Sequence, residues 1–191
     1  MAESLRILGV AGSLRRGSFN RWLLDNARAL APPTLDIEPF DIDALPLYNA
    51  DLDNDAERPQ TARRLKEAIA ACDGVLIVTP EYNHGVPGVT QNVIDWASRP
   101  AFKSPLVGKP VAMMGASGSA SATMRGQQML KLVLMSTLAE VFPHPGVGIP
   151  FAKEKFDADG RLAHEPTREF VAAFLRDFER WIRRFSSVDS S

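Results

Sequence analysis

The sequence predicts a doubly wound α/β fold, in which helices cover both faces of a five-stranded parallel sheet. Short apolar runs rich in branched residues alternate along the chain with longer segments of helical periodicity. The run at residues 75–78 contains no polar residue, as expected for a strand buried on both faces of a parallel sheet. Near the C-terminus, apolar residues recur at three- and four-residue steps, which is typical of a helix packed on such a sheet.

The order of elements follows from the same patterns. Strands are expected at residues 5–11, 34–40, 75–78, 109–115 and 141–149. Helices are expected at residues 20–30, 59–71, 87–98 and 122–140, and a last helix carries the apolar stripe of residues 170–185. The aromatic residues of that stripe are assigned to the core, and so are the methionines of the fourth strand and its following helix, with an interface as the alternative for them. Residues 1–191 are expected to form one domain.

Size and charge exclude several classes of protein. The chain has 191 residues, of which 45% are hydrophobic and 24% are charged, as in an ordinary globular domain. The net charge is −1 and no Lys/Arg tract is present, so no nucleic acid and no membrane surface are expected as partners. The first strand begins within a few residues of Met1, without a signal peptide, and no apolar run approaches the length of a membrane span. We therefore expect a cytoplasmic protein.

The sulfur and imidazole groups indicate neither a disulfide nor a metal site. Cys72 is the single cysteine, so no intramolecular disulfide can form, and its place before the third strand favours a small buried residue. The histidines His84, His144 and His164 lie in separate loops without metal-ligand spacing.

The loop after the first strand is the first candidate site. Gly12 and Gly17 have the spacing of a Walker A loop, but Ser18 and Phe19 replace the Lys and Ser/Thr that the motif requires. The GxGxxG dinucleotide motif is absent as well. What remains is a hydroxyl-rich loop at a helix N-terminus, which suits a monoester phosphate.

Three side chains of this loop are candidate hydrogen-bond donors to the phosphate, Ser13, Ser18 and Asn20, and Arg15 adds a charged donor. The alternative is an ordinary capped helix in which Ser18 satisfies the helix amides.

Two further loops follow strands of the predicted sheet. Pro80, Glu81, Tyr82 and Asn83 directly follow the third strand, at the carboxyl edge where open α/β sheets bind ligands. The alternative here is a plain strand-to-helix loop rich in turn-forming residues. The small residues 115–118 follow the fourth strand, where backbone amides can approach a ring.

These segments resemble the NADPH-dependent FMN reductases, a flavodoxin-like family that includes quinone, chromate and azo-dye reductases. The segment GSLRRGSFN resembles the family's phosphate loop, and PEYN before a Pro-Gly helix start resembles its flavin loop. The resemblance extends to PLYN at residues 46–49 and to EKFDADGRLAHEPTREF at residues 154–170. The chain departs from the usual family pattern at Gly85, Ser119 and Ser121.

The resemblance implies a strand order of 2-1-3-4-5, with FMN at the switch between strands one and three. It implies that NAD(P)H, with NADPH preferred, gives a hydride to FMN, which then reduces a quinone, chromate, an azo compound or free flavin by two electrons. No side chain is assigned as a catalytic acid or base, and no metal is expected. The cofactor-binding residues that it implies are Ser13, Arg15, Ser18, Phe19, Asn20, Pro80, Glu81, Tyr82, Asn83, Ser117 and Gly118.

The resemblance also implies a homodimer or homotetramer with the site near the interface. Residues 89–97 are a candidate interface helix, through Val93, Trp96 and Ala97, although Trp96 suits the core equally well. Two alternatives to the enzyme remain, a flavodoxin-like electron carrier and an FMN-binding regulatory module. The net charge of −1 speaks against the carrier, because such carriers are usually strongly acidic.

Overall fold

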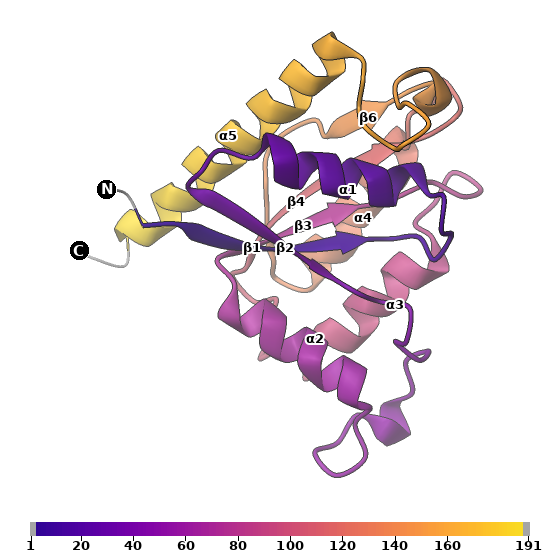
Figure 1. Ribbon diagram of the computed structural model, residues 1–191. Helices are drawn as coiled ribbons and strands as arrows, with labels where there is room; N and C mark the ends of the chain where they lie inside the picture. The colour runs from indigo at the N-terminus through magenta and orange to yellow at the C-terminus, as the bar shows by residue number, and fades with distance from the viewer. Residues whose placement is uncertain (1–2, 189–191) are drawn as a thin grey trace.

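Residues 3–188 are described by the computed structural model, in which parallel strands form one sheet with helices on both faces (Figure 1). The strands are β1 (Leu5–Ala11), β2 (Leu35–Phe40), β3 (Gly74–Val78), β4 (Pro110–Ala116), β5 (Glu140–Val141) and β6 (Val147–Ile149). The helices are α1 (Phe19–Leu30), α2 (Gln60–Ala71), α3 (Gly88–Ala97), α4 (Met124–Ser136) and α5 (Glu165–Val188), with short 3-10 helices at Ala50–Leu52 and Ala152–Glu154. The strand order β2-β1-β3-β4-β5 confirms the predicted topology.

The last part of the sheet differs from the prediction, because two short strands replace the single strand expected at residues 141–149. β5 pairs with Pro110 and Val111 at the start of β4, and β6 pairs with Met114 to Ala116 at its end. Pro143 and Pro145 lie between β5 and β6, and a proline cannot donate a hydrogen bond to the ladder. The chain therefore leaves the edge of β4 after β5 and returns to it at β6.

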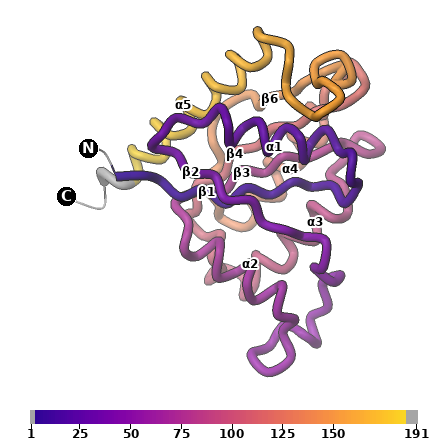
Figure 2. The backbone as a smooth tube through the Cα atoms, viewed as in Figure 1, coloured from indigo at the N-terminus to yellow at the C-terminus, as the bar shows by residue number. Residues whose placement is uncertain are grey.

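The sheet separates two apolar cores, and β3 contributes to both. Leu76 and Val78 face α1 and α5, whereas Val75 and Ile77 face α2, α3 and α4. This alternation explains the unbroken apolar run of β3, because both of its faces are buried. Figures 1 and 2 show α1 and α5 on one side of the sheet and α2 and α3 on the other.

The apolar stripe of the last helix packs on the sheet as predicted. Val171, Phe174, Leu175, Phe178 and Ile182 are buried in the core beside α1. Phe170 is the exception, since 46% of it is exposed at the start of α5. The stripe is therefore a packing surface, with aromatic pairs such as Phe178 and Trp181 inside it.

The three residues of α3 that were expected at an interface belong to the core instead, which for Trp96 was the stated alternative. Val93, Trp96 and Ala97 are buried within the chain, and the Trp96 indole N–H donates to the carbonyl of Pro46. Exposed apolar side chains lie instead on and beside α4, where Met129 and Met135 are 50% and 60% exposed. The core assignment of these two methionines is therefore wrong.

The predicted fourth helix was too long. α4 ends at Ser136, because Leu138 adopts a left-handed backbone conformation with φ of 62° that a helix cannot continue.

Candidate functional site

The candidate loops lie side by side because the strands that precede them are neighbours in the sheet. β1, β3 and β4 are adjacent and parallel, so their carboxyl ends meet at one edge, toward the right of Figure 1. The loops at residues 12–18, 79–87 and 117–123 leave from this edge. Ligands of doubly wound folds bind at such an edge, at a switch point of the strand order.

The first loop combines a capped helix with unused donors. The Ser18 hydroxyl accepts a hydrogen bond from the Asn20 N–H at 3.2 Å, so Ser18 caps the helix. Within the described chain, the N–H groups of Arg16, Gly17 and Phe19 have no hydrogen-bond partner. Arg15 and Arg16 are exposed beside them. Free amides at a helix start with arginines next to them fit the phosphate of a mononucleotide.

The two remaining polar side chains of this loop are directed into the protein. Ser13 is buried, and its hydroxyl accepts from the Arg15 N–H at 3.4 Å. The Asn20 side chain donates to the carbonyl of Ala116 at 3.0 Å and accepts from the Ala116 N–H at 2.9 Å. Asn20 thus ties the first loop to the end of β4, and one hydrogen of its amide is left for a ligand.

The second loop ends in a tight turn that presents Tyr82. The Gly85 N–H donates to the Tyr82 carbonyl at 2.9 Å, and Asn83 and His84 between them both have positive φ, 51° and 63°. Tyr82 is 56% exposed, so its ring is available to a ligand. Pro80 is buried under the turn, where its carbonyl accepts from the Thr79 hydroxyl.

Glu81 turns away from the exposed side of this turn. Its carboxylate is almost fully buried and accepts a hydrogen bond from the Gly126 N–H at 2.9 Å, at the start of α4. The Glu81 side chain therefore contacts the protein, whereas the resemblance implied that this residue binds the flavin.

The third loop presents backbone together with the exposed hydroxyls of Ser117, Ser119 and Ser121, which hydrogen-bond to one another. The Ser117 N–H donates to Ile149 and its carbonyl accepts from Ala152, so this residue is held against the segment after β6. Gly118 is exposed, and a Cβ placed on it would have nothing within 4 Å. The space around Gly118 fits a planar ring that approaches the backbone closely.

An apolar hollow of about 450 Å³ lies beside Tyr82. It is formed by the first loop, by the segment after β2 and by the start of α3. Its lining residues are Leu14, Ile42, Leu45, Leu47, Tyr82, Pro87, Gly88, Val89 and Asn92. The hollow has the size and character of a site for a small aromatic molecule.

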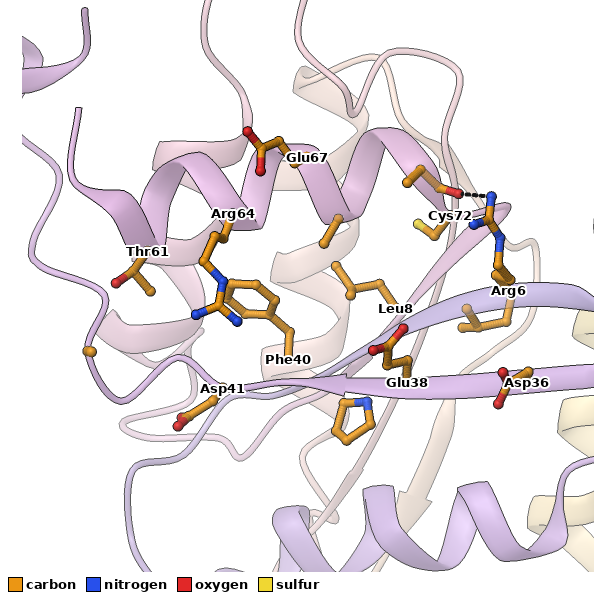
Figure 3. Close-up of a pocket in the computed structure, with 15 residues that line it drawn as sticks. Arg6, Leu8, Asp36, Glu38, Phe40, Asp41, Thr61, Arg64, Glu67 and Cys72 are labelled. Carbon is orange, nitrogen blue, oxygen red and sulfur yellow. Dashed lines mark hydrogen bonds between the residues drawn. The ribbon is translucent and has the colours of Figure 1, made fainter. Parts of the chain in front are cut away.

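A larger groove of about 590 Å³ lies elsewhere, between α2 and the strands β1 and β2 (Figure 3). Charged side chains of both signs line it, among them Arg6, Asp36, Glu38 and Arg64. None of the predicted site residues belongs to it. No signal in the sequence marks this groove, because its charged residues follow no motif and come from three separate elements, β1, β2 and α2.

Other candidate groups do not form a reactive centre. Cys72 is buried, as predicted, and burial raises the pKa of its thiol, which keeps it protonated. Among residues 3–188 no group of three or more His, Cys, Asp and Glu could hold a metal ion. In the same part of the chain, none of the helices has the length and apolarity needed to cross a membrane.

Comparisons with known proteins agree with this geometry. A NAD(P)H-dependent FMN reductase of Pseudomonas aeruginosa is 41% identical over 184 residues, which cover 96% of this chain and 98% of that protein. A 2-hydroxy-1,4-benzoquinone reductase of a Burkholderia species is 41% identical over 180 residues, covering 94% and 97% of the two chains. The solved structure of a flavoenzyme NAD(P)H:(acceptor) oxidoreductase from Paracoccus denitrificans superposes with a TM-score of 0.86 at 36% identity, over 94% of this chain and 98% of the other.

The fold and the loops at its carboxyl edge define a flavin-dependent oxidoreductase that uses NAD(P)H. More particularly, the sequence profile of the NADPH-dependent FMN reductases matches residues 5–154, and the chain belongs to that family. Its cofactors are FMN and NAD(P)H. This assignment favours the enzyme over the electron carrier and the regulatory module.

Proposed function

We propose that FMN binds across the three loops, with its phosphate at residues 13–20 and its ring system between Tyr82 and the Ser117–Gly118 backbone. The observation that carries this proposal is the set of free amides at the start of α1, next to two loops that leave room for a ring. When bound, FMN would supply the two-electron redox chemistry that links hydride donation by NAD(P)H to reduction of an acceptor.

The protein's part in this reaction is to position the cofactor. The amides of Arg16, Gly17 and Phe19 hold the phosphate with Arg15, and Asn20 keeps the phosphate loop in register with the end of β4. Phe19 also packs against Phe156, with ring centroids 5.9 Å apart, so it anchors the start of α1. Asn83 fixes the ring from the turn beside Tyr82.

Flavin exchange tests this placement. The purified protein is reconstituted with an equal mixture of FMN and FAD and then denatured, and the released flavin is identified by chromatography. The proposal predicts FMN, because the loop has room and donors for a single phosphate group. Release of FAD alone, or of no flavin, would contradict it.

We propose a quinone as the electron acceptor and NADPH as the preferred donor. The benzoquinone reductase at 41% identity supports the acceptor class, and the apolar hollow beside Tyr82 offers a site for such a ring. Leu47 is 80% exposed at the rim of this hollow. Leu47→Asp should therefore raise the KM for 1,4-benzoquinone, while the KM for NADPH stays unchanged. Equal changes in the two KM values would place the acceptor elsewhere. Rates with NADPH and NADH at equal concentrations test the donor.

We propose that the enzyme works in the cytoplasm, where NADPH is regenerated. We also propose that two copies of the chain associate through α4. Met129, Leu132 and Met135 expose an apolar stripe on α4, and Leu132 is 68% exposed. Phe102, 74% exposed, adds to the apolar surface between α3 and α4, where it lines a hollow with Val133. Contiguous exposed apolar residues of this kind are typical of a protein–protein interface.

This face is also continuous with the candidate site. The sulfur of Met129 lies 3.7 Å from the position that a Cβ on Gly85 would occupy, at the end of the Tyr82 turn. A second copy on α4 would therefore shield the turn from water.

Light scattering after gel filtration tests this association. Leu132→Glu should yield a monomer, while Phe170→Glu, which changes an exposed apolar residue on α5, should leave the oligomer intact. A wild-type monomer would contradict the proposed interface.

A further inference from the structure

The start of α4 lacks a cap of its own. Thr123 precedes the helix in a left-handed conformation with φ of 64°, and its side chain makes no capping hydrogen bond. Its hydroxyl instead accepts from the Gln127 side chain at 2.9 Å. A helix start that lacks a local cap leaves backbone N–H groups in need of an acceptor.

Glu81 provides that acceptor from a different loop. Its Oε2 accepts the Gly126 N–H at 2.9 Å, and its Oε1 lies 4.0 Å from the Arg125 guanidinium. Only 5% of the Glu81 side chain is exposed, although the residue belongs to a surface turn. A carboxylate at a helix N-terminus is favourable, because the helix dipole is positive there.

Gly126 makes this close approach possible. A Cβ on Gly126 would lie 3.1 Å from the Gly85 carbonyl oxygen and 3.3 Å from the Glu81 Cβ. The turn and the helix therefore pack backbone against backbone at this point, and Glu81 joins them by a partly buried hydrogen bond.

The turn itself needs such an anchor. Two consecutive residues other than glycine, Asn83 and His84, adopt positive φ, which costs backbone strain. Its internal hydrogen bonds are the pair between Tyr82 and Gly85, at 2.9 Å and 3.3 Å. An external anchor on Glu81, directly before the turn, holds Tyr82 at a fixed distance from the third loop, because α4 continues directly from that loop.

We propose that Glu81 is a positioning residue, which acts through the Gly126 amide to hold the Tyr82 turn against α4 and does not touch the flavin with its carboxylate. Only the expected effect of Glu81 on flavin binding rests on the proposed FMN site. The tether itself is a property of the protein without cofactor. Because the amide oxygen of glutamine can accept the same hydrogen bond, the hydrogen bond and the charge can be separated by substitution.

The experiment compares Glu81→Gln and Glu81→Ala with the wild type, and Glu169→Ala on the exposed side of α5 is the control. Hydrogen exchange of the Gly126 amide is measured without flavin, and the Kd of FMN is measured by fluorescence titration. In Glu81→Ala we expect the Gly126 exchange to accelerate at least about tenfold and FMN binding to weaken about tenfold, since a charge-assisted hydrogen bond is lost. In Glu81→Gln and the control, both quantities should stay within about twofold of the wild type.

Two results would overturn the proposal. Unchanged Gly126 exchange in Glu81→Ala would show that the tether does not protect the helix start. A loss of FMN binding in Glu81→Gln as large as in Glu81→Ala, with Gly126 still protected, would show that the charge acts on the flavin directly. If the wild type failed to bind FMN, the proposed flavin site would fall, whereas faster Gly126 exchange in Glu81→Ala would still support the tether.

Discussion

Gly115 at the end of β4 should tolerate no side chain, and the consequence can be estimated from its surroundings. A Cβ on Gly115 would lie less than 3.0 Å from the carbonyl oxygen of Thr79 and from the Thr123 hydroxyl, and 3.1 Å from the Thr123 Cβ, where ordinary contacts begin at 3.4 Å. The Thr79 backbone cannot move away easily, because its N–H donates to the Met114 carbonyl at 2.9 Å. Gly115→Ala should therefore reach the upper end of the cost of overpacking, about 3 kcal/mol.

For a chain of this size, that loss corresponds to a decrease in Tm of roughly 6–12 °C. The assay is thermal and urea unfolding of the flavin-free protein, followed by circular dichroism. Gly118→Ala, three residues further along the chain, is the matched control, since its Cβ would meet nothing within 4 Å. Its free energy of unfolding should change by less than about 0.5 kcal/mol. Equal Tm values for the two variants would refute the packing of the three loops described here.

Three further predictions concern the loops and the core. Arg15→Ala should weaken FMN binding about ten- to a hundredfold, and more than Arg16→Ala does, because the charge-assisted hydrogen bond to the phosphate is assigned to Arg15. Equal losses of affinity in titrations of the two variants would place the phosphate elsewhere. Tyr82→Phe should retain most quinone reduction at saturating FMN, since the reaction needs no phenol proton, whereas Tyr82→Ala should bind FMN more weakly. A folded but inactive Tyr82→Phe variant would disprove the positioning role of Tyr82. Burial lowers the pKa of His144, so its neutral form is favoured in the folded state, and stability should fall as the pH decreases below about 6.5. Urea unfolding at several pH values should show a smaller decrease for His144→Phe than for the wild type.

Much of the fold was predictable because its signals are local. The apolar run of β3 reflects burial on both faces, and the stripe of α5 reflects packing on one face. The division of the last strand into β5 and β6 was less accessible, because Pro143 and Pro145 show that pairing is interrupted but not where it resumes. The end of α4 depends on the left-handed Leu138, a residue type that gives no sequence signal for such a conformation.

The site was predictable as a set of loops but not as a set of contacts. The carboxyl ends of β1, β3 and β4 meet wherever those strands are neighbours, so the motifs that follow them had to lie together. The roles of Asn20 and Glu81 depend on partners 96 and 45 residues away in the chain, Ala116 and Gly126, and no spacing in the sequence links those pairs.

The exposed apolar stripe of α4 was missed for a similar reason. Apolar residues occur on both faces of α4, and only the position of the helix on the sheet decides that Leu130 and Leu134 are buried while Met129 and Met135 are exposed.

Determination of the structure of the protein in complex with FMN tests the central claim most directly. We predict the phosphate at the free amides of Arg16, Gly17 and Phe19, with the ring system between Tyr82 and Gly118 and the Glu81 carboxylate still on the Gly126 amide. FMN bound in the groove between α2 and β2, or with its phosphate away from the start of α1, would contradict the account.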